Sequence, residues 1–210
     1  MPIFDPPNVT RLLGSIEAGH LVVLCGAGLS IPSPSNLMSA LRVARACYDK
    51  WHATEVLPAP LRDDIDGLAG HFHAQGTLKS VFISTLVPWD DLVGEPNEGH
   101  AAVADFLICG AAHAALSANF DGLIEQWSNR RKVAMRGALD GAEAVQFTRT
   151  HPLLKFHGCF HRQPEETLWT QGQLQEPLIQ SRVQSCSAWM AINLPAKDLL
   201  IVGLWTDWGY

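Results

Sequence analysis

A short apolar run that leads directly into two glycines places the strongest constraint on the fold of this chain. Residues 21–25 read Leu-Val-Val-Leu-Cys, and Gly26, Ala27 and Gly28 follow at once. An apolar run without alternation is typical of a strand that is covered on both faces in a parallel sheet. Glycines let the chain turn sharply and let backbone N–H groups approach an anion such as phosphate. An ordinary strand-to-loop turn remains an alternative, because a single glycine-rich turn is not specific.

Strands and helices alternate along the rest of the chain. After the turn, apolar residues at helical spacing predict an amphipathic helix that contains Leu37, Leu41, Ala44, Tyr48 and Trp51. The later pattern predicts helices over 100–110 and 178–190, and strands within 113–122, 152–158 and 198–204. This alternation predicts an α/β fold with an open, Rossmann-like parallel sheet flanked by helices.

The chain is expected to have a discontinuous core. Residues 37–97 mix short helical pieces with Pro58, Pro60, Pro88 and Pro96, which predicts a small helical insertion. The Rossmann-like core is then formed by residues 1–36 and 98–210. Because the sequence stops directly after an apolar strand, we expect the C-terminal part of the domain to be missing and the chain to be a fragment of a longer polypeptide.

Composition excludes several classes of protein. With 47% hydrophobic and 17% charged residues among 210, the chain is globular. A net charge of −6 argues against a nucleic-acid surface of its own, and the one dense basic run, 129–132, follows a predicted helix whose end favours cations. No long apolar stretch or signal peptide is present, so we expect a cytoplasmic protein without membrane contact. The five widely spaced cysteines are typical of reduced core thiols.

Polar or glycine-rich stretches follow each predicted strand. These stretches are 26–30, 119–121, 157–158 and 203–207. If the strands are parallel, their carboxyl ends meet at one edge of the sheet, so the four stretches form one site. The site would combine a phosphate-binding turn, the amide of Asn119 beside the carboxylate of Asp121, the imidazole of His157, and a second glycine turn in which Gly203 precedes Thr206 and Asp207, which suit ribose hydroxyls.

Each of these residues also has a structural interpretation. Asn119 could be a turn residue and Asp121 a helix N-cap. A single histidine such as His157 is usually a satisfied core or loop residue. The order of the four stretches along the chain is what favours a functional interpretation.

That order resembles the sirtuin family, whose members consume NAD. The chain carries the family's Gly-Ala-Gly-x-Ser opening at 26–30, its Asn-x-Asp signature in SANFDG (117–122) and its His-Gly pair in KFHG (155–158). LWTQ (168–171) and the late LLIVGLWTDW are more similar to the prokaryotic branch that acts in antiphage defence, and among these to the NAD-hydrolysing domains that accompany short prokaryotic Argonautes.

The resemblance implies roles for the residues of the site. NAD would be held at its pyrophosphate and ribose by Gly26, Ala27, Gly28 and Ser30. Asn119 and Asp121 would orient nicotinamide, its ribose and the attacking water. His157 would be the general base, since an imidazole titrates near neutral pH.

Two departures from deacylase sirtuins matter for the reaction. Residues 32–37, Pro-Ser-Pro-Ser-Asn-Leu, replace the deacylase Pro-Asp-Phe-Arg loop, and the two Cys-x-x-Cys pairs that hold a structural zinc are missing. His157, Cys159 and His161 alternate, so on a strand they would share one face, but no fourth ligand is evident. We therefore expect no metal.

Three functions compete. The resemblance implies an NAD glycohydrolase that depletes the cofactor in antiphage defence, with NAD as its substrate. The implied partner is a sensor or activating protein, such as a short Argonaute with guide and target nucleic acid, and the chain is a candidate for oligomerisation on activation. The alternatives are an NAD-dependent protein deacylase and a non-catalytic module that senses NAD or ADP-ribose.

Overall fold

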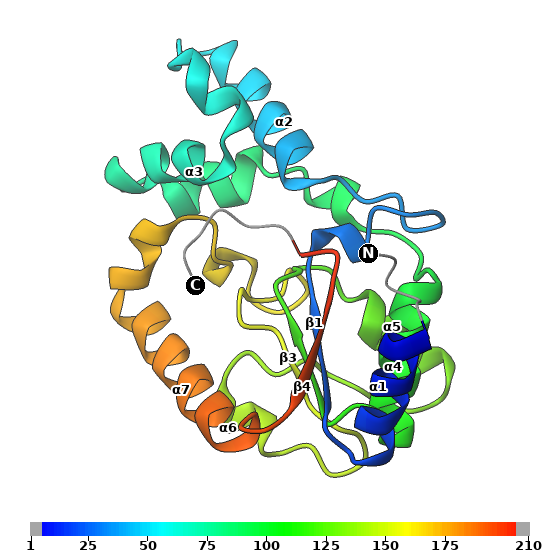
Figure 1. Ribbon diagram of the computed structural model, residues 1–210. Helices are drawn as coiled ribbons and strands as arrows, with labels where there is room; N and C mark the ends of the chain where they lie inside the picture. Colours follow the sequence, from blue (N-terminus) through cyan, green and yellow to red (C-terminus); the bar gives the residue numbers. More distant parts are fainter. Residues whose placement is uncertain (1–5, 205–210) are drawn as a thin grey trace.

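The chain folds around a sheet of four parallel strands. The computed structural model, drawn in Figure 1, describes residues 6–204, and its strands lie in the order β3-β2-β1-β4. Their bounds are β1 (Leu21–Cys25), β2 (Ala114–Ser117), β3 (Leu153–Leu154) and β4 (Asp198–Val202). All three pairings are parallel. The predicted α/β fold with an open, Rossmann-like parallel sheet is confirmed.

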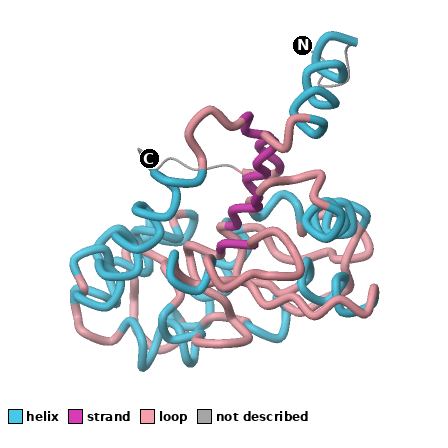
Figure 2. Tube along the Cα trace, turned by 90° about the horizontal axis from the view of Figure 1, so that it is seen from below, coloured by secondary structure: helices cyan, strands magenta, loops and turns pink. Residues whose placement is uncertain are grey.

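Helices cover both faces of the sheet. On one side lie α1 (Pro6–Glu17), α4 (Glu98–Cys109) and α5 (Leu123–Arg130), and on the other α6 (Gly141–Ala144) and α7 (Pro177–Asn193). Figure 2 shows the strands as one layer between helices. Alternate side chains of β1 enter different cores, because Val23 packs with residues of α4 whereas Val22 packs with residues of α7. This two-sided burial explains why residues 21–25 are uniformly apolar.

Strand β4 is apolar after its first residue, Asp198, but lies at an edge of the sheet. Leu199 and Ile201 are 52% and 56% exposed, whereas their neighbours along the strand are partly buried. The alternation arises because β4 pairs only with β1, and no described element covers the outward face of Leu199 and Ile201.

Strand β3 is shorter than predicted. It ends at Leu154, and the residues up to Gly158 form a turn in which the Gly158 N–H bonds the Lys155 carbonyl at 3.0 Å. The Lys155 N–H bonds the carbonyl of Ala138, which forms an isolated bridge with Leu154 at the outer edge of the sheet. The chain therefore leaves the sheet before His157.

The helical insertion has a hydrophobic core of its own. It contains α2 (Ala40–His52), the 3₁₀ turn η2 (Ala59–Asp63), α3 (Ile65–Ala74), the π-helical η3 (Leu78–Leu86) and the 3₁₀ turn η4 (Trp89–Leu92). Helix α2 starts three residues later than Leu37, since Ser39 caps it by accepting the Arg42 N–H. Phe72 and Phe82 lie at the centre of this core and pack with their rings 5.6 Å apart.

The remaining helical elements frame the sheet's carboxyl edge. These are the 3₁₀ turns η1 (Ala27–Leu29), η5 (Pro164–Glu166) and η6 (Gln171–Gln175). Helix α4 begins with a capping box between Asn97 and His100 and ends, as predicted, at Gly110, whose φ of +81° suits glycine.

All five cysteines are free, and only Cys109 is exposed. Burial raises the pKa of Cys25 and of Cys47 to about 12, so neither is a reactive thiolate. Within residues 6–204, no helix has the length and apolar character needed to cross a membrane.

Candidate functional site

The parallel sheet brings the four strand-end stretches to one edge. β1 leads into η1, β2 into Asn119, β3 into the turn that carries His157, and β4 into Gly203. The strand order reverses at β1, which lies between β2 and β4. Ligands of open α/β sheets bind at such a switch point, outside the carboxyl ends of the strands. Thr206 and Asp207, expected to bind ribose hydroxyls, lie outside the described residues.

The glycine turn packs directly against the end of β4. A Cβ atom on Gly26 would lie 2.5 Å from Leu204 Cα, and one on Gly28 would lie 2.7 Å from Gly203 Cα. The N–H of Gly26 donates to Val202 O at 3.0 Å, and that of Gly28 to Gly203 O at 2.7 Å. Two amides of the expected phosphate-binding turn therefore donate to the end of β4 instead. Glycine is needed at both positions because any side chain would clash with the backbone of that strand end.

Ser30 is the centre of a buried hydrogen-bond network that joins three segments. Its hydroxyl donates to Asp121 Oδ2 at 2.8 Å and accepts from Asn119 Nδ2 at 3.1 Å. His100 Nε2 lies 3.1 Å from the same oxygen. His100 Nδ1 accepts the Asn97 N–H at 3.2 Å, so Nε2 carries the proton and donates to Ser30. The Ser30 hydroxyl thus uses its one donor and both acceptor positions.

The network orients Asn119 towards the edge of the sheet. The side chain is 8% exposed, and the Asn119 N–H donates to Ser117 Oγ at 3.1 Å. Nδ2 is committed to Ser30, whereas Oδ1 accepts no hydrogen bond from residues 6–204. Asn119 thus keeps one acceptor for a ligand.

Asp121 has a structural role that the sequence left open. Oδ2 accepts the Ser30 hydroxyl, and Oδ1 accepts the Leu123 N–H at 3.1 Å, in the first turn of α5. The N-cap of α5 is Gly122, so Asp121 is not the N-cap that the structural alternative predicts, although its carboxylate binds the N–H of the first residue of the helix. Its charge remains close to Asn119 at the same edge.

Between these two polar residues, Phe120 points into the helical insertion. Its ring lies 4.7 Å from that of Trp169, and both pack with the insertion's core. The Phe160 N–H also donates to Phe120 O at 3.0 Å, and Phe160 stacks on Trp89 with ring centroids 4.8 Å apart. Aromatic contacts thus fix the Asn119–Asp121 loop to the insertion.

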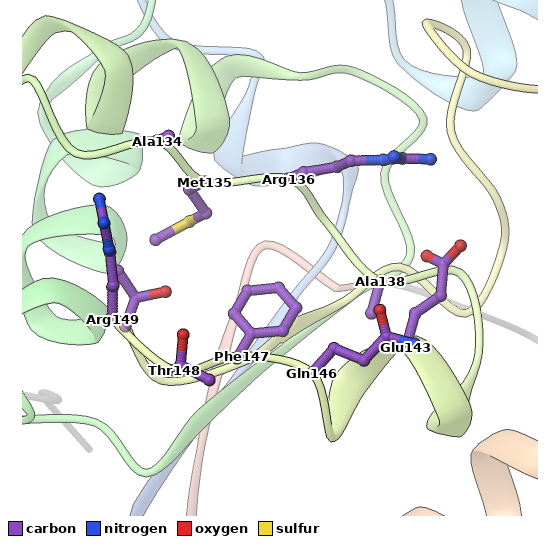
Figure 3. Close-up of a pocket in the computed structure, with 10 residues that line it drawn as sticks. Ala134, Met135, Arg136, Ala138, Glu143, Gln146, Phe147, Thr148 and Arg149 are labelled. Carbon is purple, nitrogen blue, oxygen red and sulfur yellow. The ribbon is translucent and has the colours of Figure 1, made fainter.

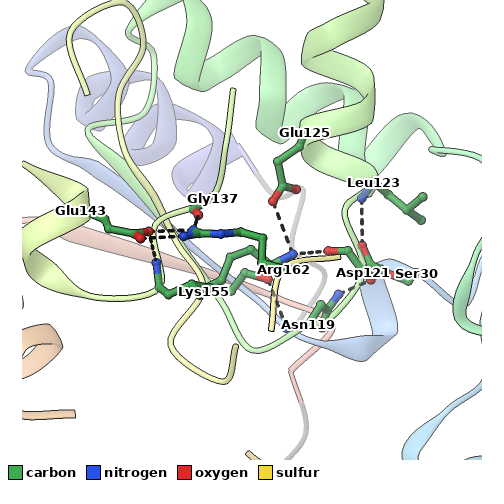
Figure 4. A network of polar contacts seen from close by, with 11 residues as sticks. Ser30, Asn119, Asp121, Leu123, Glu125, Gly137, Glu143, Lys155 and Arg162 are labelled. Atoms are coloured by element: carbon green, nitrogen blue, oxygen red, sulfur yellow. Dashed lines mark hydrogen bonds and ion pairs between the residues drawn. The ribbon is translucent and has the colours of Figure 1, made fainter. Parts of the chain in front are cut away.

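A buried lysine, Lys155, binds the backbone of the Asn119–Asp121 loop (Figure 4). Lys155 is 1% exposed, donates from Nζ to the Asp121 carbonyl and forms an ion pair with Glu125 at 3.4 Å. Burial lowers the pKa of Lys155, but Glu125, Cys159 and Asp121 together outweigh it, so the net pKa is raised. The lysine therefore remains charged, and its charge is balanced by the Glu125 carboxylate.

A second ion pair lies beside the first. Arg162 binds Glu143 through both Nη atoms, at 2.7 and 2.6 Å, and its Nη1 also donates to Gly137 O at 2.7 Å. The hydrogen bonds from Arg162 lower the pKa of the Glu143 carboxyl, whereas burial raises it. The effect of Arg162 is the larger, so the pKa is lowered overall.

His157 meets the site through the backbone of Ala118, one residue before Asn119. The pKa of His157 is lowered to about 4, chiefly by burial and also by the nearby Arg182, while a hydrogen bond with the Ala118 backbone acts in the opposite direction. The imidazole is therefore neutral at pH 7. That form can accept a proton, although a strong general base has a pKa nearer the working pH.

The alternating residues after β3 do not share a face. His157, Cys159 and His161 lie in turns rather than on a strand, and His161 packs on Gly122, where a Cβ would be 2.8 Å from its ring. Across the part of the chain that the structure describes, no group of three or more His, Cys, Asp or Glu side chains is placed to hold a metal ion.

One pocket lies beside this site, and another lies away from it. The first, of about 350 Å³, is bordered by Asp121, Glu125, Cys159, His161 and Arg162. The other, of about 280 Å³, lies between the segments around Met135 and Phe147 and is remote from the predicted residues (Figure 3). Neither is lined by Asn119 or His157.

Sequence reasoning missed three residues of this region. His100 could have been found from its position three residues after Asn97, which is the spacing of a capping box. Lys155 could have been noticed as a charge directly after an apolar strand. For Arg182, in α7, the local sequence gives no signal.

Two comparisons with known proteins identify no relative of this chain. No protein-family model matches the chain, and a search of curated proteins finds no match. The site is therefore interpreted from its geometry and from the motif resemblance.

Proposed function

We propose that this chain is an NAD glycohydrolase domain that cleaves NAD to nicotinamide and ADP-ribose. The observation that carries the proposal is the Ser30 network, which holds the signature residues Asn119 and Asp121 together at the carboxyl edge of the sheet. This edge is where open α/β sheets bind nucleotides. His157, the third element of the motif, forms a hydrogen bond with the backbone of Ala118, which directly precedes Asn119.

The chemistry requires little acid catalysis. Nicotinamide is a cationic leaving group on a ribose carbon, so its departure passes through an oxocarbenium-like transition state, as in glycoside hydrolysis. The protein must position the sugar, stabilise the positive charge and admit a nucleophile on the opposite face.

The residues at the edge suit these tasks. Asn119 Oδ1, which accepts no hydrogen bond from residues 6–204, would bind a ribose hydroxyl or the attacking water. The Asp121 carboxylate in the same loop would favour a developing cation. His157 is neutral and accepts a hydrogen bond or a proton from water or a ribose hydroxyl.

The experiment compares binding and turnover in matched variants. Asn119→Ala and His157→Ala should abolish nicotinamide release while the protein still folds, as judged by circular dichroism. Asn193→Ala is the control, since the Asn193 side-chain amide donates to Trp189 O within its own helix. A His157→Ala variant that keeps more than about a tenth of the rate would remove His157 from the role of base, since such a base contributes about 10²-fold or more.

A sensing module that binds NAD or ADP-ribose without cleaving it is the second candidate. The low pKa of His157 favours it, because a base this weak contributes less to proton transfer. Binding of NAD without release of nicotinamide, by the protein with its activating partner, would select this function.

The biological setting rests on the motif resemblance alone. We propose a cytoplasmic effector that depletes NAD during antiphage defence, and whose activity is switched on by a sensor partner such as a short Argonaute with guide and target nucleic acid. Oligomerisation on activation belongs to the same proposal.

A further inference from the structure

Arg182 is a buried cation that has no hydrogen-bonding partner among residues 6–204. The residue lies in α7 and is 8% exposed, and its Nε, Nη1 and Nη2 atoms are buried and bond to none of the residues at 6–204. Burial lowers the pKa of Arg182, but a guanidinium stays protonated in proteins. A buried charge of this kind is strongly unfavourable unless something compensates it.

The nearby acids do not pair with Arg182. Asp140 and Glu166 are close enough to act on it electrostatically. However, Asp140 Oδ1 accepts the Glu143 N–H at 2.8 Å and caps α6, and no ion pair joins Arg182 to any acid in the described part of the chain. The charge is therefore only partly balanced.

Two other cations near the site, Lys155 and Arg162, are neutralised. Lys155 is paired with Glu125, and Arg162 is held by Glu143 through two hydrogen bonds. Of these three cations, Arg182 alone has its charged group uncommitted among the described residues.

Arg182 lies near His157 of the candidate site. Its charge acts directly on His157, whose ring meets the Ala118 backbone beside Asn119. The glycine turn has committed the N–H groups of Gly26 and Gly28 to β4. An anionic ligand at this edge therefore needs a further source of positive charge.

We propose that the Arg182 guanidinium is the receptor for a phosphate oxyanion of a ligand that binds beside His157. The planar fork of arginine matches two phosphate oxygens, and a site shielded from water strengthens such a contact. The long side chain reaches the anion through a change of rotamer. If the proposed function holds, the phosphate belongs to the dinucleotide, and otherwise it is free inorganic phosphate or pyrophosphate.

The test is calorimetric titration of the full chain with ADP-ribose, adenosine, inorganic phosphate and pyrophosphate. Arg182→Gln should weaken the binding of ADP-ribose about tenfold to a hundredfold, because it removes charge-assisted hydrogen bonds. Adenosine, which has no phosphate, should bind both proteins equally. Arg182→Lys should be intermediate. The control is Arg131→Gln, since Arg131 is exposed and paired with Asp105.

The two phosphate sources give different results. Tighter binding of ADP-ribose than of pyrophosphate identifies the dinucleotide, whereas equal affinities that both fall in Arg182→Gln identify a site for the free anion. Either result supports the receptor. Unchanged affinity for all phosphate ligands in Arg182→Gln overturns it.

A stability measurement keeps the test decisive if Arg182→Gln folds poorly. Arg182→Met should raise the melting temperature, because it replaces an uncompensated buried charge by an apolar side chain of similar length. Phosphate ligands should then stabilise the wild-type protein and not the variant. A lower melting temperature with unchanged stabilisation by ligand would assign Arg182 a structural role. None of these outcomes depends on cleavage of NAD. The proposal that Arg182 binds phosphate can therefore be supported even if the proposed hydrolase activity is refuted, and the activity can be supported even if Arg182 binds no phosphate.

Discussion

The Ser30 hydroxyl donates a 2.8 Å hydrogen bond to Asp121 Oδ2, although the two residues are 91 positions apart in the chain. The contact joins the loop after β1 to the loop after β2. Because the same hydroxyl also accepts from Asn119 and His100, one oxygen atom sets the relative position of three segments.

Ser30→Ala should therefore destabilise the protein by about 1–3 kcal/mol, since it leaves buried partners of the hydroxyl unsatisfied. It should also abolish NAD turnover, because Asn119 loses its only side-chain contact in the network. Urea unfolding measures the stability. Ser84→Ala is the control, as Ser84 is exposed and its hydroxyl donates to Ser80 O one turn earlier. Equal effects of the two substitutions would contradict the central position of Ser30.

Gly28→Ala tests the close approach of β1 and β4. The new methyl group would lie 2.7 Å from Gly203 Cα, so we expect a loss of about 1–3 kcal/mol from overpacking. Gly14→Ala is a matched control, because a Cβ there meets nothing within 4 Å and Gly14 lies inside α1. That substitution should stabilise the protein by about 0.5–1 kcal/mol. Thermal denaturation of both variants distinguishes them, and a neutral Gly28→Ala would show that the two turns are not in contact.

Lys155→Met should destabilise the protein by about 3–5 kcal/mol, because it leaves the Glu125 carboxylate partly buried without its cation. The double variant with Glu125→Leu should recover a large part of this loss. The double-mutant cycle, measured by chemical unfolding, gives the coupling between the residues. Additive effects would mean that the ion pair does not support the Asp121 loop.

Much of the fold could be predicted from the sequence because the signals are local. Residues 21–25 are apolar without alternation since both of their faces are covered, and Gly110 ends α4 because the chain needs a positive φ there. After Asp198, strand β4 has the same apolar character as β1, and its exposed face depends on the strand order, which no local pattern encodes.

The candidate site was predictable in its strand-end residues but not in their contacts. The parallel strands place Asn119, Asp121 and His157 at one edge, as the order of motifs predicts. The hydrogen bonds of the glycine turn to the end of β4, and the lack of a partner for Arg182 among residues 6–204, arise from packing between distant segments. The sequence around these residues therefore carries no sign of either feature.

The lowered pKa of His157 predicts how stability depends on pH. The pKa is about 4 in the folded protein and about 6.5 when unfolded, so the unfolded chain binds more protons between these values. Stability should therefore fall as the pH is lowered from about 6.5 to about 4. In His157→Gln, the difference in unfolding free energy between pH 7 and pH 5 should be smaller than in the wild type. His71→Gln is the control, since His71 lies in α3 and bonds Gln75. An equal pH dependence in both variants would show that His157 is not buried as a neutral group.

The most direct test of the proposed activity is chromatography of the products formed from NAD by the complete protein with its activating partner, with and without an acetyl-lysine peptide. The account predicts that nicotinamide and ADP-ribose appear without peptide and that adding it changes nothing. In the Asn119→Ala protein, the same assay should show intact NAD. Turnover that requires the peptide and yields an O-acylated ADP-ribose, or NAD that is bound and never cleaved, would contradict the hydrolase.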